Sequence, residues 1–328
     1  MGFFSKKIEI ANQKREALLG VTDAYRVVNG APDGFPGMTL DRYGERFQVQ
    51  FFGSELLHEK SSLVESIADV FSPECIVVKE RLSSSGKSLE NAPMEVLLGT
   101  REAAVGTVRE GNAHFHVDLM DTINPGLFLD MRHVRLEVEK RFQEMSSTCA
   151  NASDGLRFLN LFSYTCSFSV HARLGGAAIA TNADISGKIL DKGRENYALN
   201  GLDLRPGEFF KGNALEYVRW ALKKGLRFDG IVLDPPSFAR FKGFNFNVRE
   251  HLFPLVAECA GILNPGGFFM VSSNYSEFNL KHFASDVREA VASVHASAKT
   301  QWMRGQDLDF NGSGSTKDSC LVATLVKV

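Results

Sequence analysis

Residues 229–238 have the sequence DGIVLDPPSF, and this stretch decides the fold class. Gly230–Leu233 is a short apolar run, and the acid Asp234 and two prolines follow at its carboxyl end. Proline fixes φ and has no N–H to donate to a β-ladder, so the backbone must leave the sheet just after Asp234. We therefore expect a buried strand that ends in a rigid turn.

Similar apolar runs lie on both sides of this strand, and segments of helical character separate them. The other predicted strands are Phe158–Phe162, Ala178–Ala183, Glu208–Lys211 and Phe268–Ser272. The predicted helices are Phe168–Leu174, Ser186–Asn200, Leu215–Lys224, Val248–Leu263 and Ser276–Val294. This alternation predicts an α/β fold with a Rossmann-like parallel sheet and helices on both faces. Two final apolar runs, Ala298–Met303 and Ser319–Lys327, predict an antiparallel last strand at the edge.

The first third of the chain has a different pattern, in which turn residues split short strands. The predicted strands are Tyr25–Val28, Met38–Leu40, Phe47–Phe52, Cys75–Lys79, Met94–Leu98 and His114–Leu119. Ser54–Val70 is a predicted amphipathic helix, and Arg81–Glu90 is a predicted surface loop. We therefore expect an arm or helix over residues 1–22, a small α+β domain over 23–120 and a catalytic domain over 121–328, with 124–142 as a connecting segment.

Composition excludes several classes of protein. The 328 residues carry a net charge of −2, which neither favours nor excludes a nucleic-acid partner. The five cysteines are scattered without C-x-x-C spacing, a pattern that favours a reducing compartment over disulfides or zinc. His114 and His116 have no third ligand beside them, so no metal site is expected. Without a signal peptide or long apolar stretch, we expect a cytoplasmic protein with no membrane partner.

The loop after the first strand of the α/β region, Ser163-Tyr-Thr-Cys-Ser167, is the predicted cofactor loop. It lacks the G-x-G-x-x-G pattern that lets backbone amides approach a pyrophosphate, which disfavours a dinucleotide. The next strand ends at Asp184, where a carboxylate is placed to accept both hydroxyls of a ribose. S-adenosylmethionine (SAM) has a ribose and an amino-acid tail but no phosphate, and fits both features. An ordinary βα turn with a solvent-facing Asp184 is the alternative.

The turn after Asp234 is the predicted catalytic segment. The Asp234 carboxylate and the backbone carbonyls of the turn would surround a planar amine or ring nitrogen near a methyl donor. Phe238 would stack on a base. The alternative is that the two prolines only terminate a strand.

Several of these segments together resemble one family. They are FLNLFSYTCSFSVHARLGG, ADIS, GRENYALNGL, DGIVLDPPSFAR and LNPGGFFMVSSN. They resemble the class I SAM-dependent methyltransferases that modify large-subunit ribosomal RNA, namely the 23S cytosine-C5 and guanine-N7 enzymes. Two upstream stretches also resemble parts of the family. The start of the family's substrate-side domain is similar to RVVNGAPDGFPGMTLDRYGERFQVQF, and its entry into the catalytic domain is similar to FHVDLMDTINPGLFLDMRHVR. Because few residues precede Tyr25, we expect the PUA-like RNA-binding module that many cytosine-C5 members carry to be lacking.

The resemblance implies a role for individual residues. The cofactor-binding set that it implies is Phe128, Asn160, Phe162, Ser163, Tyr164, Thr165, Asp184, Ile185, Asn213 and Asp234. In this set Asp184 holds the ribose and Asn213 lies beside the adenine amino group, while Phe128, with Asp130 and Arg132, belongs to a stretch that folds over the pocket. The implied catalytic set is Asp234, Pro235, Pro236, Phe238 and Asn274.

Two positions depart from the family pattern. Cys166 stands where the family has glycine, at a point where backbone and cofactor approach closely. Asn213 stands where the family has aspartate, so its amide would accept from the adenine amine without charge assistance.

The end of the fifth strand bears on the chemistry. Methylation of cytosine C5 needs a cysteine thiolate that adds to the base first, and Val271–Asn274 contains no cysteine. Asn274 resembles the guanine-N7 relatives, whose target nitrogen already has a lone pair and needs only positioning. We therefore expect direct in-line methyl transfer to a base nitrogen of ribosomal RNA, by a monomer or homodimer.

A basic rim for RNA is expected from Lys79, Arg81, Lys223, Lys224, Arg227, Arg240 and Lys242. Scattered solvated charges would have the same pattern. Two other functions remain open: methylation of a small molecule or protein, and a catalytically inactive SAM-fold factor that serves ribosome assembly.

Overall fold

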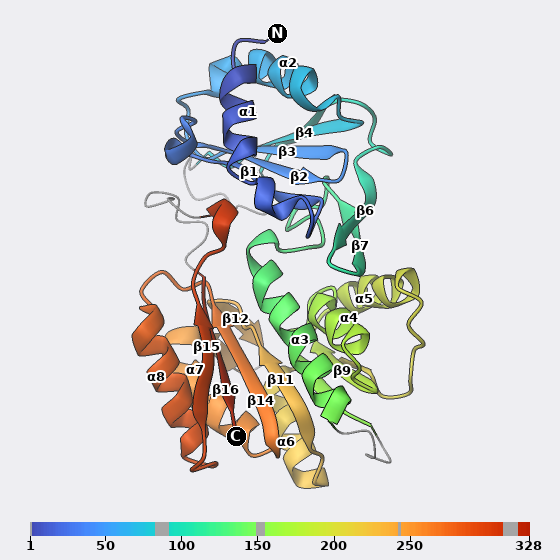
Figure 1. Cartoon of the computed structure of the whole chain (residues 1–328), viewed down its shortest axis with the longest axis vertical. Helices are drawn as coiled ribbons and strands as arrows, with labels where there is room; N and C mark the ends of the chain where they lie inside the picture. Colours follow the sequence, from blue (N-terminus) through green and yellow to red (C-terminus); the bar gives the residue numbers. More distant parts are fainter. Residues whose placement is uncertain (1, 83–91, 149–154, 242–243, 311–320) are drawn as a thin grey trace. The chain divides into compact units, whose positions relative to one another are not determined.

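The computed structural model describes residues 2–82, 92–148, 155–241, 244–310 and 321–328, which fold into two compact units (Figure 1). The first unit is Met1–Arg132 with Asp307–Asp318, and the second is His133–Gln306 with Ser319–Val328. The expected arm is thus part of the first unit. The chain passes into the second unit after Arg132 rather than at residue 120, and it returns to the first unit for a short segment near the end.

The second unit is built on a seven-stranded sheet in the order β10-β9-β8-β11-β14-β16-β15. Its strands are β8 (Arg157–Leu161), β9 (Ile179–Asp184), β10 (Phe209–Lys211), β11 (Phe228–Leu233), β14 (Leu263–Ser273), β15 (Lys299–Arg304) and β16 (Val322–Lys327). The first five strands in this order run parallel, and β16 is antiparallel to both of its neighbours. The predicted α/β fold with an antiparallel last strand is confirmed.

Helices cover both faces of this sheet. They are α3 (Arg132–Thr148), α4 (Ser167–Leu174), α5 (Gly187–Leu199), α6 (Ala214–Lys224), α7 (Val248–Ala260) and α8 (Leu280–Ala292). Phe142 of α3 contacts Phe158 of β8 and Phe268 of β14 edge to face. Leu159 and Phe269, one position further along the same strands, pack instead into the core with α6, α7 and α8. Because strand side chains alternate between faces, both faces of the sheet are buried.

One prediction for this unit was wrong, and one feature was missed. Residues 132–148, taken largely as a connecting segment, form α3, which buries Val134, Val138 and Phe142 at a helical spacing of four. The turn after Asp234 continues into a hairpin that we did not predict, made of β12 (Phe238–Phe241) and β13 (Phe244–Asn247). Its sequence signal was the alternation of Phe244 and Phe246 with asparagines.

The first unit contains a five-stranded sheet in the order β1-β2-β3-β4-β5. Its strands are β1 (Ala24–Asn29), β2 (Met38–Tyr43), β3 (Arg46–Phe51), β4 (Cys75–Glu80) and β5 (Met94–Leu98), with a separate hairpin of β6 (Val105–Glu110) and β7 (Ala113–Asp118). The helices α1 (Ser5–Gln13) and α2 (Lys60–Phe71) share one apolar core with this sheet. The short helices η5 (Leu129–Met131) and η6 (Leu308–Phe310) also belong to this unit.

The two faces of this sheet differ in polarity. Alternate residues such as Leu40, Val49 and Val78 pack into the apolar core with α1 and α2. The intervening residues are polar and yet buried, and they are Arg26, Asn29, Thr39, Asp41, Gln48, Gln50 and Lys79. Segments distant in sequence supply partners on this polar face: Gln48 donates to the Leu119 carbonyl and Lys79 to the Thr122 carbonyl.

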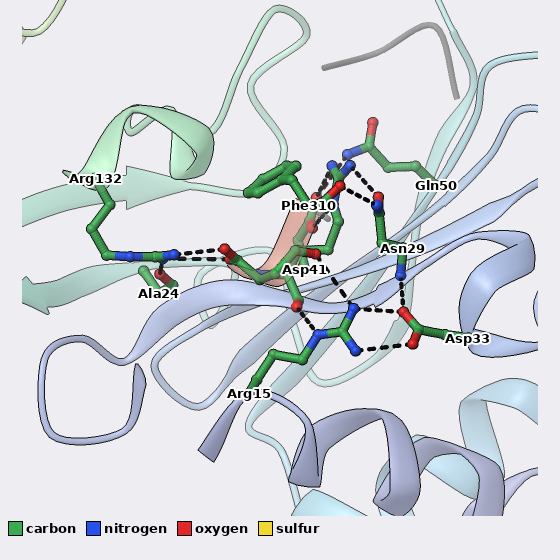
Figure 2. Close-up of polar contacts among 10 residues, drawn as sticks. Arg15, Ala24, Asn29, Asp33, Asp41, Gln50, Arg132 and Phe310 are labelled. Carbon is green, nitrogen blue, oxygen red and sulfur yellow. Dashed lines mark hydrogen bonds and ion pairs between the residues drawn. The ribbon is translucent and has the colours of Figure 1, made fainter. Parts of the chain in front are cut away.

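An ion-pair network crosses the polar face (Figure 2). Arg26 pairs with Asp41 at 2.7 Å, and its guanidinium lies over the ring of Phe310. Asp309 of η6, fully buried, accepts from the backbone N–H of Arg26 and pairs with Arg132 at 2.6 Å. Burial disfavours the charged form of Arg132, but Asp309 and Asp307 more than compensate and raise its pKa. The returning segment is therefore held in the first unit by buried charge pairs.

Within the described part of the chain, no helix is long and apolar enough to cross a bilayer. A group of three or more potential metal ligands is also absent from the described residues. Most of the predicted Arg81–Glu90 loop lies outside the described residues.

Candidate active site

The carboxyl edge of the large sheet is where the predicted site residues meet. Strand order reverses between β8 and β11, because the chain proceeds from β8 outward through β9 and β10 and then returns to β11 on the other side. Ligands of open α/β sheets bind outside the strand ends at such a reversal. Phe162 follows β8, Asp184 ends β9, Asp234 follows β11 and Asn274 follows β14, so parallel pairing brings all four to this edge.

The loop after β8 has an unusual backbone. Four non-glycine residues in the described part of the chain have positive φ, and three of them are Phe162, Tyr164 and Cys166, at φ values of 58°, 47° and 63°. Left-handed backbone costs an L-residue roughly 1–2 kcal/mol, so the surrounding structure must hold the loop in place. Asn196 of α5 does so by donating to the Thr165 carbonyl at 3.0 Å. The N–H groups of Ser163 and Cys166 donate to the carbonyls of Ala183 and Ser163, so backbone hydrogen bonds also hold the loop.

Cys166, one of the departures from the family pattern, is accommodated by a glycine on the facing helix. Its thiol is fully buried, and a Cβ at Gly193 of α5 would overlap its Sγ. Burial raises the pKa of the Cys166 thiol, so the group stays protonated. The positive φ at this position explains why glycine is favoured there, and the space at Gly193 explains how cysteine fits.

Asp184 is tied to the loop by backbone hydrogen bonds. Its two carboxylate oxygens accept from the N–H of Tyr164 at 3.1 Å and of Ser186 at 2.9 Å. Burial raises the pKa of Asp184, and the backbone donors only partly oppose this effect. Ile185, beside it, is about half exposed at 53%. A carboxylate linking the two loops, next to an exposed apolar side chain, suits a ribose with a base beside it.

Asn160 lies beneath the loop in a chain of buried polar side chains. Its amide nitrogen donates to Ser169 Oγ at 3.1 Å and lies 3.4 Å from Asn182 Oδ1. Its own Oδ1 is buried and has no hydrogen-bond partner. A buried acceptor without a donor costs about 1–3 kcal/mol, and such atoms are most easily explained where a ligand supplies the missing donor.

Asn213 begins α6. Its Oδ1 accepts from the N–H of Leu215 at 3.0 Å, so the side chain is the N-cap of the helix. A carbonyl oxygen has a second lone pair, and the predicted contact with an adenine amine would have to use it.

Asp234 is oriented from the neighbouring strand. Ser272 of β14 donates its hydroxyl to Asp234 Oδ1 at 2.8 Å, and three residues further on Ser237 donates to Asn274 Oδ1 at 3.3 Å. These two bonds join both ends of the turn through Pro235 and Pro236 to β14. The sequence indicated the end of β14 as a functional position but not that Ser272 contacts Asp234.

The hairpin that follows presents an aromatic side chain. Phe238 is 52% exposed at its start, directly after the catalytic turn. Phe246 on β13 is buried and contacts the ring of Phe162 in the loop after β8. The hairpin is therefore anchored on the predicted cofactor loop.

Phe128 lies in the first unit, unlike the rest of the predicted set. It precedes η5 and is 41% exposed. Arg132, from the same stretch, is buried in ion pairs with Asp307 and Asp309. The part that Phe128 plays at the cofactor pocket stays a prediction.

The polar groups at this edge match the chemistry of SAM. The unpartnered Oδ1 of Asn160 leaves an acceptor for a donor such as an ammonium group. Asp184 offers an acceptor to ribose hydroxyls. No cluster of phosphate-binding glycines accompanies them. The arrangement is compatible with a nucleoside ligand that carries an amino-acid tail.

Comparison with known proteins identifies the family. Residues 86–301 match the model of the S-adenosylmethionine-dependent methyltransferase family. The chain belongs to this family, and SAM is its cofactor. A crystal structure of a protein provisionally described as a methyltransferase, in complex with SAH, the demethylated product of SAM, has a TM-score of 0.82 at 25% identity and covers 100% of this chain and 82% of that one.

Relatives with assigned names point to RNA enzymes. YwbD of Bacillus subtilis (strain 168), provisionally named a ribosomal RNA large subunit methyltransferase, is 33% identical over 86% of this chain and 69% of its own length. Ribosomal RNA large subunit methyltransferase I of Klebsiella pneumoniae (strain 342) is 29% identical over 83% of this chain. The chain spans 66% of that enzyme, just under two thirds of its length.

Proposed function

We propose that this methyltransferase transfers the SAM methyl group directly to a ring or exocyclic nitrogen of a base in large-subunit ribosomal RNA. The names of the relatives support the RNA class. The observation that carries the choice of a nitrogen is the Ser272–Asp234 contact, in which a hydroxyl near the end of β14 meets the carboxylate that follows β11, whereas the end of β14, Val271–Asn274, has no thiol.

The cofactor would be held by the loop after β8. In this proposal Phe162–Thr165 surround the methionine tail, Asn160 Oδ1 accepts from its ammonium group, and Asp184 holds the ribose. Ile185 and Asn213 would then border the adenine. SAM supplies the electrophilic methyl group, and the protein supplies position and electrostatics.

Asp234 would accept from an N–H of the target base, with the carbonyl of Pro235 as a second acceptor and Phe238 stacked on the base. Asn274, tied to Ser237, would contact the base edge. A nitrogen that presents its lone pair to the sulfonium methyl needs no covalent intermediate.

The cysteines support a mechanism without a thiolate. Cys75, Cys166 and Cys259 are buried, and burial raises the pKa of each thiol. A cytosine-C5 mechanism needs a low-pKa, accessible thiolate, which none of these three provides. Cys149 and Cys320 lie outside the described residues.

The test combines product analysis with adduct trapping. The protein is incubated with methyl-labelled SAM and large-subunit ribosomal RNA, and the RNA is digested to nucleosides for mass spectrometry. We expect a nitrogen-methylated base and no protein–RNA adduct on RNA that contains 5-fluorocytosine. A C5-methylated pyrimidine, or a trapped adduct, would contradict nitrogen transfer. Label on protein or a small molecule, with none on RNA, would contradict the RNA class.

A further inference from the structure

Ser272 and Asp234 occupy equivalent positions on neighbouring strands. β11 and β14 run parallel with Leu233 aligned to Val271, so the next residues lie side by side at the carboxyl edge. The Ser272 hydroxyl donates to Asp234 Oδ1 at 2.8 Å, and Ser272 is fully buried.

The position of Ser272 is fixed on both sides. β14 pairs with β11 on one side and with β16 on the other, where Ser272 is aligned with Ala323. A residue in the middle of a sheet cannot move without disturbing both ladders. Its hydroxyl is therefore a fixed reference for the more exposed carboxylate.

The turn after Asp234 has few donors of its own. Pro235 and Pro236 lack N–H groups, so the backbone at these two positions cannot donate to the carboxylate. Ser272 supplies a donor from the neighbouring strand, and the Ser237–Asn274 bond holds the far end of the turn.

We propose that Ser272 is a positioning residue for methyl transfer, which fixes the Asp234 carboxylate so that it can accept from an N–H of the target base. The proposal rests on the proposed role of Asp234 beside the transferred methyl group. A hydrogen bond to a carboxylate fixes its plane as well as favouring its charged form.

A nucleophilic role for Ser272 does not fit the geometry. Its proton is donated to a carboxylate, and a carboxylate is far too weak a base to ionise an alcohol. The buried hydroxyl is also closed to a base in solution.

The test uses binding of two SAM-like molecules and needs no RNA. Sinefungin carries an amine in place of the methylsulfonium group, so it presents a cation where the methyl group would be. SAH has no such group. The ratio of the SAH to the sinefungin dissociation constant, from calorimetry, therefore reports how well Asp234 faces the transfer position.

We expect Asp234→Asn to lower this ratio about tenfold or more, because a charge-assisted bond is lost. Ser272→Ala should lower it by about 3- to 10-fold, which corresponds to one hydrogen bond, with SAH affinity unchanged. Ser272→Thr keeps the hydroxyl and should restore the ratio. Ser273→Ala is the matched control, because Ser273 is equally buried and its Oγ accepts from the Tyr275 N–H instead.

The outcomes separate the two levels of the proposal. If Asp234→Asn lowers the ratio and Ser272→Ala does not, Ser272 is not a positioning residue. If neither variant changes the ratio, the placement of Asp234 fails and the role of Ser272 fails with it. Should Ser272→Ala not fold, Ser272→Cys replaces it, because a thiol keeps the size and is a weak donor.

Discussion

The two sheets of this protein use buried polarity in opposite ways. In the first unit, one whole face of the sheet is polar, and Arg26, Asp41 and Lys79 are buried in its middle. In the second unit both faces are largely apolar, and charged groups such as Asp184 and Asp234 appear where strands end. The first arrangement ties distant segments together, whereas the second leaves polar groups where a ligand can reach them.

This contrast teaches that burial alone does not mark a functional charge. The buried charges of the first unit already have partners within the protein, as in the pair of Arg26 with Asp41. At the carboxyl edge of the second unit, an acceptor such as Asn160 Oδ1 is left without one. Thr39 Oγ1 in the first unit is also without a partner, so what distinguishes Asn160 is its place beneath a loop at the strand-order reversal.

The largest expected effect is on stability, at Asp309. Asp309→Ala would leave Arg132 buried with a single remaining acid and the Arg26 N–H without its acceptor, so we expect a loss of about 3–5 kcal/mol in the free energy of unfolding. Denaturant unfolding of the whole chain measures it. Asp191→Ala, at an exposed pair with Arg194, should change stability by less than about 1 kcal/mol.

Denaturant unfolding of the Asp234→Asn variant tests the same contrast at the second sheet. Since Asp234 lies at a strand end, its neutralisation should leave stability within about 1 kcal/mol of wild type. Equal losses at Asp309 and Asp234 would contradict the division into structural and functional charges.

The next largest effect is expected on the pH dependence of stability, and it comes from Lys79. Burial, with Arg81 nearby, lowers the pKa of Lys79 to about 8. Between that value and about 10.4 the unfolded chain binds more protons, so the free energy of unfolding should rise with pH by up to about 3 kcal/mol. Lys79→Met should remove this rise, and Lys140→Met, at a lysine 62% exposed, should not. Identical pH profiles for Lys79→Met and wild type would contradict the buried-lysine interpretation.

The smallest expected effect concerns packing beneath the cofactor loop. Gly193→Ala would crowd Cys166 and should cost about 1–3 kcal/mol, with weaker SAM binding because the loop shifts. Adding Cys166→Gly to the Gly193→Ala variant should restore most of the lost stability and most of the lost SAM affinity. Thermal melting and calorimetric SAM titration measure the two effects.

The control for crowding between Gly193→Ala and Cys166 is Gly305→Ala, where an added Cβ would make only an ordinary contact. Additive losses in the double variant would show that Cys166 and Gly193 do not depend on each other.

Local pattern determined the succession of strands and helices in the catalytic unit. Buried runs of apolar residues, broken by residues such as Pro235 and Gly201, were enough to predict its sheet and the antiparallel last strand. The positions of Asp184 and Asp234 at strand ends followed from the same pattern, because parallel strands bring their carboxyl ends to one edge.

Tertiary structure alone decided which side chains act together. The bond between Ser272 and Asp234 joins residues 38 positions apart, and the pair of Arg132 and Asp309 joins residues 177 apart. The sequence does not show which partner each of these side chains takes, because a hydroxyl or a carboxylate can hydrogen-bond equally well to many groups. Strand register and burial select one of them, and these are properties of the folded chain.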